Sequence, residues 1–124
     1  MKITYLDAGL REVIEVVDYP ECPTYDTAVI HRAKEFAGNF DAKITRAVPQ
    51  RDPNQWILEL EIPLVVRRKH TPLPGDRVRF RAKIGHHQRE VMGTYYFKRY
   101  HAYLIFDDGG GEWEIQSMWQ MKKM

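Results

Sequence analysis

The sequence predicts an α+β fold rich in β-structure, in which an N-terminal hairpin, one helix and a second hairpin pack against a C-terminal unit of curved strands. Residues 77–83 alternate between cations and apolar residues without a break, which is typical of a strand with one buried face. Residues 26–37 carry apolar side chains at helical spacing. Glycine and proline clusters divide the rest of the chain into segments of strand length.

The first hairpin is predicted from two short strands, residues 3–6 and 11–17, joined by a turn at residues 7–10 that contains Gly9. Pro20 and Pro23 then indicate a loop, because proline donates no backbone hydrogen bond to a sheet. The predicted helix begins near Asp26 as a cap and ends at Gly38 and Asn39.

A second hairpin is predicted from residues 40–48 and 55–62, with a proline-containing loop at residues 49–54. In its second strand the alternation places Leu58 and Leu60 inside, and Glu59 and Glu61 outside. The basic run at residues 67–70 and the prolines at 72 and 74 follow. The C-terminal tail, residues 120–124, is expected to be frayed.

The chain length of 124 residues predicts a single domain, made of a β-β-α-β-β part at residues 1–70 and a small barrel part at residues 75–119. The lone Cys22 excludes an internal disulfide and a multi-cysteine zinc site, and it favours a reducing, cytoplasmic location. The N-terminus has scattered charges and no long apolar run, so neither a signal peptide nor a membrane partner is expected.

Charge is unevenly distributed along the chain, although the formal net charge is only +2. Residues 67–99 hold ten Lys or Arg against two acids, so this segment carries +8 and the remainder carries −6. This segregation indicates a positive patch that faces an anionic partner. The alternative is that acidic strands lie beside the basic ones and neutralise them.

The segment after Pro74 has a recognisable pattern of turns and strands. It runs through Gly75-Asp76-Arg77-Val78-Arg79, then Gly93-Thr94, then Leu104-Ile105-Phe106-Asp107-Asp108-Gly109 and Glu112-Trp113. This pattern resembles the SH3-like barrels of the Tudor type. The resemblance covers residues 75–119 and implies a five-stranded barrel that binds nucleic acid or protein segments. No aromatic cage for methylated residues is carried over, because the strand after Gly75 lacks an aromatic residue where a cage wall is expected.

The candidate binding residues are a basic comb, a neighbouring basic run and two aromatic rings. Alternate residues of a β-strand lie about 6.6 to 6.8 Å apart, close to the spacing of successive phosphates on an extended single strand of nucleic acid. The predicted contacts are Arg67, Arg68, Lys69, Arg77, Arg79, Arg81, Lys83 and Arg89, with Tyr95 and Phe97 stacking on bases. The competing interpretation is a solvated face whose long cations protect an edge strand from pairing.

Six of the fifteen aromatic residues lie between positions 95 and 106. Because a strand hides every second residue, the alternation would place Tyr96, Tyr100, Leu104 and Phe106 inside and leave Tyr95, Phe97 and Tyr103 exposed. A hairpin turn near residues 98–99 would reverse this parity.

The predicted function is non-enzymatic binding of an anionic partner, with nucleic acid, single- or double-stranded, ahead of an acidic protein surface. No cofactor and no metal is expected, since His86 and His87 have no metal-ligand spacing. The alternative is a small protein-interaction or assembly protein, such as an inhibitor, adaptor or particle connector, that self-associates or binds through Trp113 and Trp119. A metal-dependent nuclease built on Asp41, Glu59 and Glu61 is disfavoured. Such a site would be completed by a lysine two positions after the strand acid, and the residues that follow Glu59-Leu60-Glu61 are Ile62 and Pro63.

Overall fold

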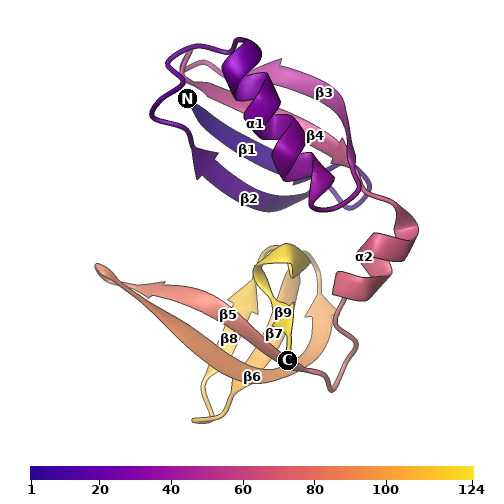
Figure 1. Cartoon of the computed structure of the whole chain (residues 1–124). Helices are drawn as coiled ribbons and strands as arrows, with labels where there is room; N and C mark the ends of the chain where they lie inside the picture. Colours follow the sequence, from indigo (N-terminus) through magenta and orange to yellow (C-terminus); the bar gives the residue numbers. More distant parts are fainter. The chain divides into compact units, whose positions relative to one another are not determined.

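The computed structural model describes all 124 residues, and the chain divides into two compact units, Met1–Lys69 (unit 1) and His70–Met124 (unit 2). Strands make up 48% of the residues and helices 18%, which confirms the β-rich α+β prediction. Each unit has its own sheet, and neither sheet is closed (Figure 1). The single-domain organisation expected from chain length stays a prediction.

Unit 1 is a four-stranded sheet with one helix on a face. Its order along the sheet is β2-β1-β4-β3, with β1 parallel to β4 and the other pairs antiparallel. Both predicted hairpins and the predicted helix are present. The elements are β1 (Lys2–Asp7), β2 (Glu12–Asp18), α1 (Thr27–Gly38), β3 (Lys43–Pro49), β4 (Gln55–Glu61) and α2 (Leu64–His70).

The core of unit 1 lies between α1 and the sheet (Figure 1). Asp26 caps the helix by accepting a hydrogen bond from the backbone of Ala28. Tyr5 is fully buried and stacks on Phe36 with 3.7 Å between ring centroids. Burying a side chain of this size contributes roughly 2 to 3 kcal/mol. Its hydroxyl remains satisfied at 2.7 Å from the hydroxyl of Tyr19, and burial raises the pKa of Tyr5 well above its usual range.

The second helix, α2, corrects the prediction of a single helix. It follows Pro63, whose carbonyl accepts from the backbone of Val66 and Arg67, and proline suits the first turn of a helix. None of its residues is buried, and seven residues are too few to display a helical period in the sequence. The basic run at 67–70 is therefore helical.

Unit 2 is a five-stranded antiparallel sheet with the order β8-β7-β6-β5-β9, in which β5 to β8 form a meander and β9 returns to pair with β5. The aromatic segment is divided into two strands by a turn at Tyr100 and His101, close to the turn near residues 98–99 that the sequence left open. The tail, expected to be frayed, instead pairs with β5, and Met121 is buried. The elements are β5 (Arg77–Ile84), β6 (His87–Arg99), β7 (Ala102–Asp107), β8 (Glu112–Ile115), a 3-10 turn η1 (Met118–Gln120) and β9 (Lys122–Lys123).

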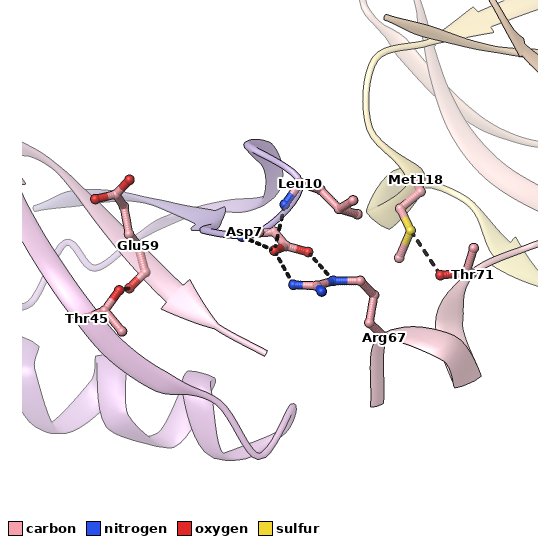
Figure 2. Close-up of polar contacts among 8 residues, drawn as sticks. Asp7, Leu10, Thr45, Glu59, Arg67, Thr71 and Met118 are labelled. Carbon is pink, nitrogen blue, oxygen red and sulfur yellow. Dashed lines mark hydrogen bonds and ion pairs between the residues drawn. The ribbon is translucent and has the colours of Figure 1, made fainter. Parts of the chain in front are cut away.

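The core of unit 2 is formed on one face of this curved sheet. Trp113 and Trp119 pack against it while staying partly buried. Thr71 donates a hydrogen bond to the sulfur of Met118 over 3.4 Å (Figure 2). The buried members are Val78, Phe80, Ala82, Val91, Tyr95, Tyr103, Ile105, Ile115, Met118 and Met121.

Candidate nucleic-acid interface

Strand β5 has the predicted alternation of buried and exposed residues. Val78, Phe80 and Ala82 enter the core, and the cations between them point to the opposite side. Residues that pair directly across an antiparallel ladder share a face, so Lys122 of β9 lies on the same side as its partner Arg79. We call this side of the sheet the basic strand face, and its cations on β5 are Arg77, Arg79, Arg81 and Lys83.

Two cations of the basic strand face are held by acids of unit 2, which corrects the expectation of four free contacts. Arg77 forms a two-pronged contact with Asp108, at 2.6 and 2.7 Å. This contact raises the pKa of Arg77 and lowers the pKa of Asp108. Arg79 lies 3.6 Å from Glu90. Both pairs are solvent-exposed and therefore weak, so either acid can be exchanged for another anion.

Arg81, Lys83 and Arg89 are exposed and form no ion pair. All three lie where β5 and β6 pair only with each other. β9 reaches only Val78 and Arg79 on one side, and β7 begins its ladder at Gly93 on the other. We call residues 81–90 the ribbon, and Figure 1 shows this hairpin extending beyond the other strands of its sheet.

Arg67 is not available to a ligand, contrary to prediction. Its guanidinium donates to both carboxylate oxygens of Asp7, at 2.8 and 3.2 Å, within unit 1 (Figure 2). Asp7 is fully buried, so this arginine stabilises the fold.

Arg68 and Lys69 are exposed on α2 and form no ion pair, but they belong to unit 1, whereas the ribbon belongs to unit 2.

The predicted parity of the aromatic segment is wrong at four tyrosines, whereas Leu104 is buried as predicted and Phe106 is half-buried. The four are Tyr95, Tyr96, Tyr100 and Tyr103. Tyr95 is 6% exposed and packs on Tyr103, so it offers no stacking surface. A β-bulge between Tyr95 and Phe97 shifts the register, and Phe97 is exposed as predicted. The other exposed rings are Tyr96 and Tyr100, which the sequence placed inside.

The two tryptophans expected at a protein interface are structural. The indole nitrogen of Trp113 donates to Asp107 over 2.7 Å, and its ring meets Phe80 edge-on. That indole contact, followed by the backbone of Gly111, lowers the pKa of Asp107. The charge of Arg89 contributes more weakly to the same shift. Trp119 packs against the core and lies 5.4 Å from the ring of His70.

Glu59, expected on the solvent side, is 6% exposed and is held by Arg11, in the turn before β2, and by Arg46 of β3. Figure 2 shows Thr45 donating to its carbonyl oxygen. Two guanidinium groups around one carboxylate leave it poorly suited to a divalent ion. No group of three or more His, Cys, Asp or Glu side chains is placed to hold a metal ion.

None of the helices combines the length and the apolar character needed to cross a membrane.

Comparisons with protein-family models, with curated proteins and with solved structures found no match for this chain.

Proposed function

We propose that this protein is a non-enzymatic binding module for nucleic acid, and that unit 2 carries the contact surface. The observation that carries the proposal is the group of three exposed, unpaired cations at the end of the β5–β6 hairpin. Glu90 lies across the ladder from Arg81 and 3.6 Å from Arg79, and the charge of Arg89 acts on Asp107, but Arg81, Lys83 and Arg89 form no ion pair themselves. A hairpin whose exposed cations outnumber its acids, and are not held in ion pairs, favours a polyanion.

Arg77 and Arg79 can add two further phosphate contacts to this surface, because their exposed ion pairs can be exchanged. Phosphate can replace Asp108 or Glu90, because a guanidinium binds either anion with the same two-pronged geometry. Phe97 and Tyr96 supply exposed ring faces on the neighbouring strand. Bases stack on such rings regardless of sequence.

The proposal includes the fold of unit 2 as an SH3-like barrel of the Tudor type. Supporting it are five consecutive antiparallel strands, the position of the first strand β5 between β6 and the last strand β9, and the glycine turn at 109–111 before β8. Barrels of this size bind ligands on strand faces and in loops.

A second candidate is a protein-interaction or assembly component. The observation that favours it is an exposed apolar cluster on β6, the rings of Tyr96 and Phe97, whose centroids lie 6.0 Å apart and which are 54% and 42% exposed. Met92, on the same strand, is 46% exposed. Aromatic residues beside arginines dominate binding hot spots. Size-exclusion chromatography over a range of concentrations tests self-association through this cluster, and Tyr96→Ala should then return the protein to a monomer.

The experiment for the main proposal is a fluorescence-anisotropy titration of the full chain against labelled 20-mer DNA, single- and double-stranded, between 50 and 200 mM salt. Three phosphate contacts predict a slope of about −2 to −3 for log K against log salt, which for a duplex is a loss of about 40-fold over this range. Binding that ignores salt, or no binding to either DNA, would overturn the proposal.

A further inference from the structure

The ribbon is exposed along nearly its whole length. Within residues 81–90 only Ala82 is buried, and every other residue is exposed. Two-stranded hairpins are marginally stable in water on their own, and ordering each residue costs about 1 to 2 kcal/mol. The ribbon contributes only Ala82 to the core of unit 2. A contact with something outside the chain would therefore account for its length.

The cations of the ribbon lie on both of its faces. Arg81 pairs with Glu90 and Lys83 with Gln88, so these four share the basic strand face. Arg89 pairs with Ala82, and alternation turns it to the opposite side. A strand that follows one phosphate chain needs cations on one side only, whereas an element lying between two phosphate chains needs them on both.

The tip of the ribbon is narrow and carries an apolar side chain. Ile84 pairs with His87, which leaves Gly85 and His86 as a two-residue loop. The φ of Gly85 is +62°, a conformation that glycine adopts without strain in such hairpin turns. Ile84 is 48% exposed. An exposed isoleucine beside cations suits a groove, where thymine methyl groups are the apolar features.

We propose that the ribbon enters the major groove of B-form DNA, with Arg81 and Lys83 toward one phosphate backbone and Arg89 toward the other. This inference rests on the proposed function and names its substrate as duplex DNA. Four residues per strand span about 14 Å. The major groove, about 12 Å wide, admits a two-stranded ribbon, whereas the minor groove, about 6 Å wide, does not admit it without deformation. The major groove of A-form RNA is too narrow and deep for side chains.

The test compares the full chain on three labelled ligands of one sequence at fixed salt: a 20-base-pair DNA duplex, its single strand, and the RNA duplex. The duplex DNA is expected to bind at least tenfold more tightly than either of the others. Equal or tighter binding of the single strand or the RNA would overturn the groove assignment while leaving the proposed function intact. Failure of all three ligands to bind would overturn both.

A variant in which the three ribbon cations are replaced by uncharged glutamines tests where the DNA is contacted. Arg81→Gln, Lys83→Gln and Arg89→Gln together should reduce the slope of log K against log salt for duplex binding by about 2 to 3, because three phosphate contacts are lost. The matched control Lys34→Gln, Lys43→Gln and Arg51→Gln makes the same change in net charge on exposed residues of unit 1 and should bind as the wild type does. Equal losses in both variants would indicate attraction by bulk charge and would overturn the role of the ribbon.

Dimethyl sulfate footprinting identifies the groove, since this reagent methylates guanine N7 in the major groove and adenine N3 in the minor groove. Protection of guanine N7 is expected in the complex with the wild type, and it should disappear with Ile84→Glu, which places a carboxylate at the tip. Because Ile84 is outside the core, this variant should keep the wild-type melting temperature. Protection confined to adenine N3 would contradict the assignment.

Discussion

The guanidinium of Arg67 donates two hydrogen bonds to the buried carboxylate of Asp7, sixty residues earlier in the chain (Figure 2). The same carboxylate accepts from the backbone of Gly9 and Leu10, so it organises the β1–β2 turn as well. A Cβ on Gly9 would overlap the guanidinium, which explains a glycine there although its φ is ordinary. Two distant segments of unit 1, the end of β1 with its turn and the helix α2, therefore meet at one carboxylate.

Arg67→Ala should destabilise unit 1 by about 3 kcal/mol, because the loss of one partner leaves the other charge buried and uncompensated. Arg67→Lys should recover only part of this loss, since an ammonium cannot reproduce the two-pronged contact. Urea unfolding with amide exchange of β1 measures the effect. The neighbouring exposed Arg68→Ala is the control and should stay within about 0.5 kcal/mol of the wild type. Similar losses for Arg67 and Arg68 would contradict the structural role of Arg67.

Gly93→Ala should destabilise unit 2 by roughly 1 to 3 kcal/mol, which is the usual range for overpacking. A Cβ at this position would overlap the carbonyl oxygen of Phe106 and lie 2.9 Å from the Cα of Asp107, and backbone atoms cannot move aside as a side chain does. The control is Gly109→Ala, where the nearest atom lies at 3.4 Å in the carboxylate of Asp107. Thermal unfolding of both variants measures the difference, and a wild-type melting temperature for Gly93→Ala would contradict the close approach of β6 and β7.

Unit 2 should lose stability in acid through Asp107. Its folded pKa is lowered by the indole of Trp113 and the backbone of Gly111, so the unfolded chain takes up the proton more readily. The stabilisation is then complete above about pH 5 and is lost as the pH falls through the ordinary aspartate value, about 3.9, toward the lowered folded value. Unfolding midpoints between pH 3 and 7 test this.

Asp107→Asn should flatten this acid dependence and lower the stability at pH 7, because one carboxylate oxygen becomes an amide donor that faces the N–H of either the Trp113 indole or Gly111. The indole N–H resonance of Trp113 should shift in the same variant. If the acid limb of the wild type and the variant coincide, another group is responsible for the pH dependence.

The sequence predicted the elements of unit 1 well because their signals are local. Hydrophobic alternation in β4, the apolar stripe of α1 and its Asp26 cap each depend on neighbouring residues alone. The helix α2 was missed because it buries nothing and is held by one distant ion pair.

The candidate site was predicted in part, and the errors share a physical cause. Alternation correctly placed Arg81 and Lys83 on an exposed face, but partner choice depends on contacts distant in sequence. Asp108, thirty-one residues from Arg77, and the β-bulge after Tyr95 have no local signal. The projection of the ribbon was equally invisible, since it depends on where β7 and β9 stop pairing.

Tyr100 is the residue of unit 2 whose conformation is hardest to explain by folding alone. It occupies the β6–β7 turn with a φ of +57°, which favours glycine, and its side chain is 90% exposed. A bulky residue retained in this conformation without packing suggests a binding role.

Tyr100→Gly should therefore raise the stability of unit 2 by about 0.5 to 1 kcal/mol while weakening binding to duplex DNA. Tyr100→Phe, which keeps the ring and the strain, should change neither property. Urea unfolding and anisotropy titrations measure both, and a stabilised Tyr100→Gly variant that binds as the wild type does would show that the ring makes no contact with the ligand.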